Sequence, residues 1–315
     1  MRKVFFQICL SVLLLGYFAL RVNWGELAAA FIGINAGFYL LSTLATLMAL
    51  VLVSFKYRLL IAHTSLDLPF SRLVAINFIT KFYALFLPSA LGPEAVRWYK
   101  ITRNKKGKAF FLASTIVERL LFILVLFACG SIPLFFTGHP DVKDLADRLW
   151  PVLAAASAGL LCVLAYFLWP AFQQKARTFL MKTLDLSEDS RLKAFLDNFS
   201  LKNSTPEIFG KLLFYSLVWQ LFFLIRIYFL FESLDLPFTF QDATWMGSLV
   251  MLLQVLPVTF SGLGIREGAY AFLFSLQGVS AEAGVVVGLL FFSQMLVLSL
   301  IGWALQLIEK PSDIK

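Results

Sequence analysis

The six-residue motif Ser-Leu-Asp-Leu-Pro-Phe occurs twice in this chain, at 65–70 and at 233–238. Each copy is followed, at almost the same distance, by a Leu-Pro and then by a glycine-containing break with Glu and Arg beside it. The first break reads Leu-Pro-Ser-Ala-Leu-Gly-Pro-Glu-Ala-Val-Arg over 87–97, and the second reads Leu-Pro-Val-Thr-Phe-Ser-Gly-Leu-Gly-Ile-Arg-Glu over 256–267. Interrupted helices that carry charge, at corresponding positions of two halves, are typical of a transport site within a membrane.

Composition places these breaks in a bilayer. Of the 315 residues, 60% are apolar and only 15% are charged, and the mean hydropathy is +0.82. This balance predicts an all-α polytopic membrane protein. The net charge of +8 is explained by basic loops that touch anionic lipid, so we expect no nucleic-acid partner. The three cysteines lie within apolar runs, which indicates neither a disulfide framework nor a metal site.

Crossing the hydrocarbon layer of ~30 Å takes about 20 apolar residues. Six segments come close to this length: 4–20, 38–62, 109–136, 149–169, 209–231 and 282–307. The first also resembles a signal peptide, because Arg2 and Lys3 precede it and Ala28–Ala30 resembles a cleavage site. We favour an uncleaved first span, which the topology requires.

The basic residues set the orientation. With a cytoplasmic N-terminus, the three most basic connections, 56–72, 97–108 and 171–208, all lie inside, and the outer loops carry mainly acidic residues. Both termini are then cytoplasmic. Apolar residues recur at helical spacing in 171–208, which predicts an amphipathic connector at the membrane surface.

The same rule predicts a re-entrant hairpin over 72–101. A full crossing by 72–91 would place the basic stretch 97–108 outside, whereas a segment that dips in and returns keeps it inside. The second interrupted segment, 241–277, enters from the opposite face. A hairpin and two short spans would both return this segment to the side from which it enters, so the charges do not distinguish them. Its likeness to the first copy favours the hairpin.

We therefore expect one transmembrane domain, 1–315, with about six transmembrane helices and two re-entrant helical hairpins arranged as an inverted repeat. Non-helical backbone at membrane depth is tolerated only inside protein or beside a watery cavity, so the two tips are expected to meet near the middle. The parts are half one, 38–136, with hairpin 72–101; the connector 171–208; and half two, 209–307, with hairpin 241–277.

Five residues are candidates for binding an anionic substrate. Gly92 and Gly264 stand where a new helix begins, and a helix N-terminus offers free N–H groups to phosphate or carboxylate. Arg97 and Arg266, one near each tip, add guanidinium groups that hold phosphate by two hydrogen bonds. Lys81, within the first hairpin, is a further embedded cation that we place in the cavity.

Four charged residues are candidates for gating or coupling. Glu94 and Glu267 lie beside the tip arginines, where they would hold these cations in the empty site or carry a proton; the alternative is a fixed structural pair. Glu118 and Arg119 are adjacent charges inside the third span. Adjacent residues point ~100° apart on a helix, so each needs a partner on another element, and the tip charges are the obvious ones.

Enzyme motifs are absent from the sequence: we find no P-loop, no metal-ligand spacing and no nucleophile elbow. We therefore expect no enzymatic activity and no cofactor. Without an ATP site, transport would be passive or driven by an ion gradient or the membrane potential.

At these residues the chain resembles a known family. The first tip with Arg97, the Glu118–Arg119 pair and above all Gly262-Leu-Gly-Ile-Arg-Glu-Gly268 are similar to the flippase-like family that includes the transmembrane region of lysylphosphatidylglycerol synthase. The resemblance covers roughly 5–308. Family members more often have Gly-Gly-Asp where this chain has Gly92-Pro93-Glu94, and the soluble aminoacyl-transferring domain of the synthase is not present here. The resemblance implies lipid translocation and not lipid synthesis.

The expected function is therefore a flippase that moves an anionic or zwitterionic phospholipid, or a polyprenyl-phosphate-linked lipid, across a bacterial cytoplasmic membrane. Two alternatives stay open: an ion-coupled carrier of a small anionic solute, and an accessory subunit of a separate lipid-synthesising or glycosyl-transferring enzyme. The sequence also leaves open whether copies of the chain associate as a homo-oligomer.

Overall fold

The computed structural model describes residues 24–62, 68–87, 92–103, 108–136, 140–168, 206–255, 259 and 262–309. Helices and short turns make up these residues, and no strand occurs among them. Three predicted features fall outside the described residues: the span 4–20, almost all of the connector 171–208, and the two tips at 88–91 and around 256–261.

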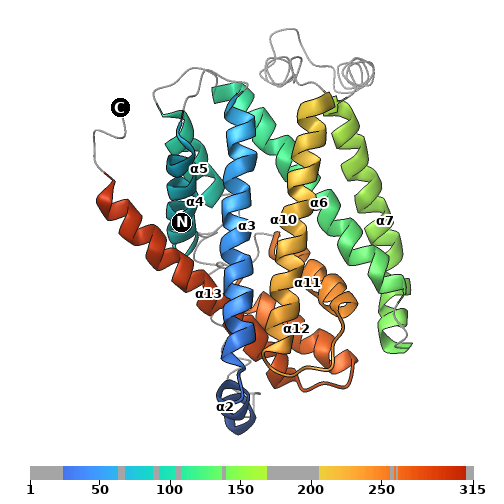
Figure 1. The fold of residues 1–315 in the computed structure, drawn as a ribbon. Helices are drawn as coiled ribbons and strands as arrows, with labels where there is room; N and C mark the ends of the chain where they lie inside the picture. Colours follow the sequence, from blue (N-terminus) through green and yellow to red (C-terminus); the bar gives the residue numbers. More distant parts are fainter. Residues whose placement is uncertain are drawn as a thin grey trace.

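Five long helices run along the molecule (Figure 1). Four of them contain stretches long and apolar enough to cross a membrane: Ala36–Ala62, Val142–Cys162, Gly210–Glu232 and Ala281–Ile308. The helices in full are α3 (Ala36–Ala62), α6 (Lys108–Phe135), α7 (Pro140–Leu168), α10 (Pro206–Glu232) and α13 (Ala281–Ile308). The protein is thus an all-α, multi-pass membrane protein, and α6, with 28 residues, matches the other four in length.

Two pairs of short helices interrupt this series. The first pair is α4 (Phe70–Ala84) and α5 (Gly92–Thr102), and the second is α11 (Phe240–Val255) and α12 (Ile265–Leu276). At a rise of 1.5 Å per residue, helices of 11 to 16 residues are about 17–24 Å long, which is less than the hydrocarbon layer. Each pair begins and returns at one end of the molecule, and the two pairs do so at opposite ends (Figure 1).

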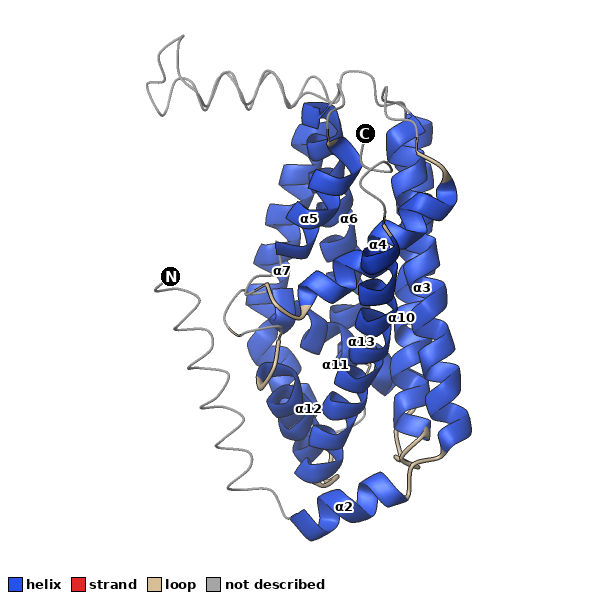
Figure 2. Ribbon diagram, turned by 90° about the vertical axis from the view of Figure 1, so that its left-hand side faces the viewer, coloured by secondary structure: helices blue, strands red, loops and turns tan. Residues whose placement is uncertain are grey.

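The helices of the two halves pack across each other. Helix α3 lies along α10, α4 lies against α13, and α11 lies against α6 (Figures 1 and 2). Glycines make the closest approaches possible: a Cβ at Gly302 of α13 would overlap the carbonyl of Phe78 in α4, and a Cβ at Gly284 would lie 2.5 Å from the backbone nitrogen of Ala271 in α12. Small residues at helix interfaces are a common means of close packing in membranes.

Three details differ from the sequence analysis. Helix α2 (Trp24–Ile32), which lies across the end of the bundle where α3 begins (Figure 2), was not predicted. Helix α7 begins at Pro140 rather than at 149, so the charges at 143–148 lie on its first turns. Lys56, counted among the basic residues of an inner connection, is 3% exposed within α3.

Candidate functional site

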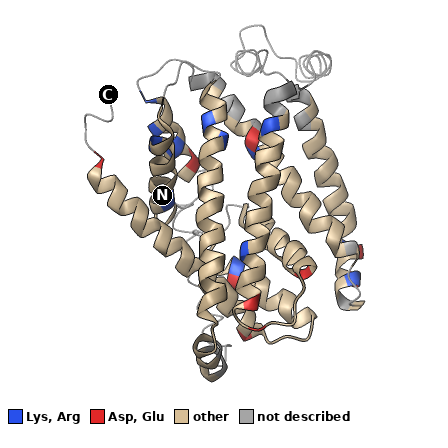
Figure 3. Ribbon diagram, viewed as in Figure 1, with Lys and Arg blue, Asp and Glu red and all other residues tan. Residues whose placement is uncertain are grey.

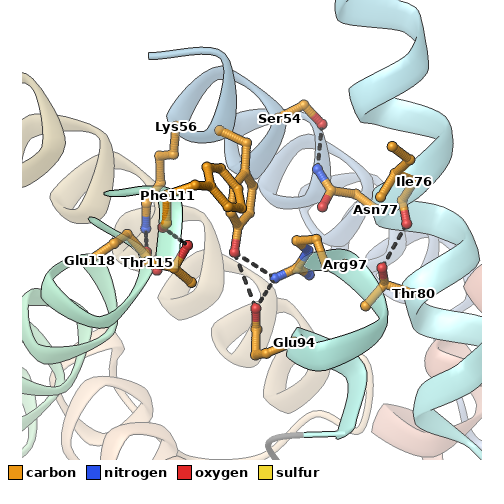
Figure 4. Close-up of polar contacts among 11 residues, drawn as sticks. Ser54, Lys56, Ile76, Asn77, Thr80, Glu94, Arg97, Phe111, Thr115 and Glu118 are labelled. Carbon is orange, nitrogen blue, oxygen red and sulfur yellow. Dashed lines mark hydrogen bonds and ion pairs between the residues drawn. The ribbon is translucent and has the colours of Figure 1, made fainter. Parts of the chain in front are cut away.

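The first group of embedded charges joins α5 to α3. Arg97 Nη1 donates to Glu94 Oε2 (2.5 Å) and to the Tyr57 hydroxyl (2.8 Å), and that hydroxyl donates to the same Glu94 oxygen (3.1 Å) (Figure 4). The guanidinium carbon lies 4.8 Å from the centre of the Tyr57 ring. Arg97 is 7% exposed, so this compact triangle holds its charge away from water.

The geometry of α5 explains why Glu94 and Arg97 meet. They are three residues apart on one helix, which places them on the same face. Glu94 lies in the first turn, where a carboxylate is stabilised by the helix dipole. Gly92 allows the chain to fold back: a Cβ there would lie 2.7 Å from the Cβ of Leu87. Within the described residues Gly92 thus has a packing role, and its predicted role in substrate binding stays a prediction.

Glu118 and Arg119 do not pair with each other. Glu118 forms an ion pair with Lys56 of α3, so it does find a partner on another helix, but that partner is not a tip charge (Figure 4). Arg119 has its guanidinium carbon 5.1 Å from the Phe122 ring centre. Glu118 is therefore already neutralised by Lys56, whereas Arg119 forms no ion pair with a described residue.

The second group is centred on the start of α12. Arg266 is fully buried and donates to Glu267 Oε1 through Nη2 (2.5 Å) and Nε (3.1 Å). The other oxygen, Glu267 Oε2, accepts from the backbone N–H of Gly264 (2.7 Å). Gly264 has φ 84°, a left-handed conformation that favours glycine. The glycine therefore lets the backbone N–H reach Glu267, which in turn orients Arg266.

Arg226 on α10 completes this group, although the sequence analysis did not select it. It is 8% exposed, and its Nε donates to the Gln294 side chain at 2.7 Å. Its guanidinium carbon lies 3.5 Å from the centre of the Phe291 ring, and that of Arg266 lies 4.9 Å from the same centre. A charged residue within an otherwise apolar span was the available signal. No described carboxylate pairs with Arg226.

Lys81 lies on the last turn of α4, where it is partly exposed. Its backbone carbonyl accepts from Ser299 of α13 at 3.0 Å. No ion pair or hydrogen bond joins its ammonium group to a described residue. The structure thus pairs the predicted residues Glu94 with Arg97 and Arg266 with Glu267, and Arg226 lies against the same ring as Arg266. The predicted role of Lys81 in the site stays a prediction.

Two buried arginines in this arrangement have unused hydrogen-bond donors. Arg97 Nε and Arg266 Nη1 are buried without a hydrogen-bond partner among the described residues. A guanidinium offers five donors, and phosphate oxygens suit them well. In the described part of the chain, no three His, Cys, Asp or Glu residues lie close enough together to hold a metal ion. The site can therefore bind an anion through arginine and lysine side chains.

A separate charged contact ties the first short pair to the end of α13. Glu309, whose side chain is 2% exposed, accepts from Lys100 of α5 at 2.6 Å and forms an ion pair with Arg72 of α4. Burial favours a raised pKa, but the hydrogen bonds and charges of Lys100 and Arg72 outweigh it and hold the pKa of Glu309 below its ordinary value. No pattern in the sequence predicted this contact, because it depends on how α13 crosses α4. Figure 3 shows the charged residues on the ribbon.

Comparison with known proteins agrees with the resemblance seen in the motifs. A model of one protein family, described as the lysylphosphatidylglycerol synthase TM region, matches residues 4–302, which is nearly the whole chain. A search of curated proteins found no match.

Proposed function

We propose that this chain, which belongs to the family of the lysylphosphatidylglycerol synthase transmembrane region, is a lipid flippase. The family places the chain in membrane lipid biology. The proposal goes further: the headgroup of a phospholipid or of a polyprenyl-phosphate-linked lipid passes through the protein while the tails stay in the bilayer. No chemical step is required.

One observation carries the proposal: a buried arginine on each of the two short helix pairs keeps a hydrogen-bond donor that no described residue accepts. These donors are Arg97 Nε of α5 and Arg266 Nη1 of α12, and Arg226 of α10 lies against the same Phe291 ring as Arg266. A charged side chain inside a membrane costs at least about 3 kcal/mol on insertion scales, so such residues usually serve the path of a charged substrate.

The helix packing supports the proposed architecture of two inverted halves, each with a re-entrant hairpin. In the first half a long helix is followed by a short pair and a second long helix, α3, α4, α5 and α6, and the second half repeats this order in α10, α11, α12 and α13. The contacts between halves are reciprocal, since α4 of one half packs on α13 and α11 of the other packs on α6. Such inverted halves allow a central site to open to each side in turn.

In this mechanism Arg97 and Arg266 bind the headgroup phosphate near the two ends of the path, and Lys81 and Arg226 bind it between them. Glu94 and Glu267 hold the arginines when no phosphate is present, since each already bonds its arginine. We place the protein in a bacterial cytoplasmic membrane with both termini inside, in keeping with the basic connections.

The test is headgroup translocation in proteoliposomes, measured with acyl-labelled phospholipids of which only the outer-leaflet fraction is quenched. The variant Arg266→Gln is compared with the double variant Arg266→Gln/Glu267→Gln, because the single change leaves Glu267 buried without its cation. If the Arg266–Glu267 pair had only a structural role, the double variant would recover both flipping and stability. We expect it to recover stability and remain inactive; a wild-type rate in the double variant would exclude Arg266 from the site.

A further inference from the structure

The end of α13 holds both helices of the first short pair through one carboxylate. Glu309 Oε1 forms an ion pair with Arg72 of α4, and Glu309 Oε2 accepts from Lys100 Nζ of α5 at 2.6 Å. A third donor, Gln306 Nε2, bonds the same Oε2 at 3.0 Å. Arg72 is the third residue of α4, and Lys100 is the third from the end of α5. The carboxylate therefore joins the point where the pair begins to the point where it returns.

This cluster differs from the deepest charged pair in its closeness to water. Arg266 and Glu267 are 0% and 1% exposed, so separating them would leave two charges inside the protein. The side chains of Arg72 and Lys100 keep 20% and 14% of their surface exposed, at helix ends. Their charges can be hydrated when the contact opens, so the Glu309 cluster can separate at a much smaller cost than the Arg266–Glu267 pair.

The packing of α4 on α13 provides a pivot for such an opening. The two helices are closest where Gly302 of α13 meets the carbonyl of Phe78 in α4, since a Cβ at Gly302 would overlap that oxygen. Glu309 follows Gly302 by two helical turns, and Arg72 precedes Phe78 by almost two, so the cluster lies about 9–11 Å from the pivot along each helix. Rotation of about 30° at this pivot would separate the two ends by roughly 5 Å, which is enough to break the hydrogen bonds of the cluster.

Resting on the proposed function, we infer that Glu309, a residue that the sequence analysis did not select, is the gating residue of the first short pair. With the cluster closed, α4 and α5 are held to the end of α13 and the headgroup does not enter from that end. When Glu309 releases Lys100 and Arg72, the pair swings about its contact with α13 and opens the way to Arg97. Arg97 and Lys100 lie three residues apart on α5, so a movement at the end of this helix reaches the buried arginine.

Labelling of a buried cysteine measures this opening without any movement of lipid. Thr102, on the last turn of α5, is 1% exposed, so Thr102→Cys reports when this end of the pair separates from the bundle. The native cysteines, Cys9, Cys129 and Cys162, are first replaced by serine. The labelling rate with a polar maleimide is then measured on the full chain in detergent. We expect Glu309→Gln to raise it about tenfold, because the variant removes the charged contacts to both helices.

Controls separate local opening from unfolding. Asp144→Asn breaks an ion pair within α7 whose side chains are 76% and 64% exposed, Arg148 with Asp144, and should leave the labelling of Thr102→Cys unchanged. Ser248→Cys, at a position of α11 that is 0% exposed, should stay slow to label when Glu309→Gln is added. Lys100→Met removes one of the two ion pairs and should raise the labelling of Thr102→Cys by a smaller factor than Glu309→Gln.

A cross-link tests whether flipping requires the opening. A reducible bifunctional thiol reagent joins Lys100→Cys to Glu309→Cys in the cysteine-free chain, and the control joins Asp144→Cys to Arg148→Cys within one helix. We expect the first cross-link to slow phospholipid flipping in proteoliposomes by at least about tenfold, and reduction to restore the rate. The control cross-link should have no effect.

The outcomes distinguish this inference from the proposed function. If Glu309→Gln leaves the labelling of Thr102→Cys unchanged, or speeds that of Ser248→Cys equally, the gate is wrong. Unchanged flipping after the cross-link between positions 100 and 309 would also overturn the gate and leave the flippase proposal standing. Faster labelling of Thr102→Cys alone, with no lipid movement in any form of the protein, would support the opening of the first pair and refute the flippase proposal.

Discussion

The crossing of α12 on α13 offers a sharp test of how packing positions the second charge group. A methyl group added at Gly284 would lie 2.5 Å from the backbone of both Tyr270 and Ala271, and ordinary contact begins at 3.4 Å. Backbone atoms cannot rotate away, so the two helices must separate by about 1 Å or distort. Overpacking of this kind costs about 1–3 kcal/mol.

The matched control is Gly159→Ala, because an added Cβ at that position of α7 has nothing within 4 Å. Both substitutions gain about 1 kcal/mol of intrinsic helix propensity, so the difference between them isolates the clash. We expect Gly284→Ala to be less stable than Gly159→Ala by about 1–3 kcal/mol. For a chain of this size that is a thermal midpoint lower by about 2–5 °C.

The assay is thermal unfolding in detergent, followed by tryptophan fluorescence and by size-exclusion chromatography after heating. A second readout is lipid flipping, since α12 carries Arg266 and Glu267, and α13 carries the Phe291 ring beside Arg266. We expect Gly284→Ala to flip lipid more slowly than Gly159→Ala. Equal midpoints for the two variants would refute the reasoning, because they would show that α12 and α13 do not approach as closely as the backbone distances require.

Three further predictions concern individual contacts. Arg97→Gln alone should destabilise the protein by about 1–3 kcal/mol, because Glu94, whose side chain is 26% exposed, loses its charged partner. Glu94→Gln/Arg97→Gln should recover most of that stability, and the denaturation midpoints of the two variants decide it. Gly264→Ala should lower the stability of the protein by about 1–2 kcal/mol, since an alanine at φ 84° is strained. An unchanged denaturation midpoint in this variant would contradict the prediction. The lowered pKa of Glu309 means that its charged contacts stabilise the protein above its ordinary pKa of 4.5 and stop doing so as the pH falls through the lower value in the folded protein. The stability difference between wild type and Glu309→Gln should therefore be full at pH 7 and shrink below about pH 4.5; a difference independent of pH would show that the carboxylate charge contributes nothing.

Most of the helical pattern was predictable because membrane spans leave a strong signal. The predicted spans 38–62, 209–231 and 282–307 differ from α3, α10 and α13 by only a few residues at each end. The glycine-containing breaks also indicated that the interrupted segments form short helices. Helix α2 was missed because nine residues carry too little periodicity to be read as a helix.

The partners of the charged residues were less predictable, because pairing depends on which helices lie side by side. Sequence spacing correctly indicated that Glu118 needs a partner on another helix, but nothing in the spacing pointed to Lys56. The pairs Glu94–Arg97 and Arg266–Glu267 are local and could be expected from the chain itself. Arg226 was not selected from the sequence, because its burial against Phe291 follows only from the packing of α10 on α13.

The packing between halves has a consequence for how the proposed movement is coupled. Each short pair rests on a long helix of the other half, α4 on α13 and α11 on α6. At Gly302, α4 and α13 approach so closely that α4 cannot slide without moving α13. Helix α13 also carries Gly284 and Gly288, against which α12 is packed. We therefore expect a displacement of the first pair to reach Arg266 and Glu267 through α13, because α4 and α12 both pack closely on that helix.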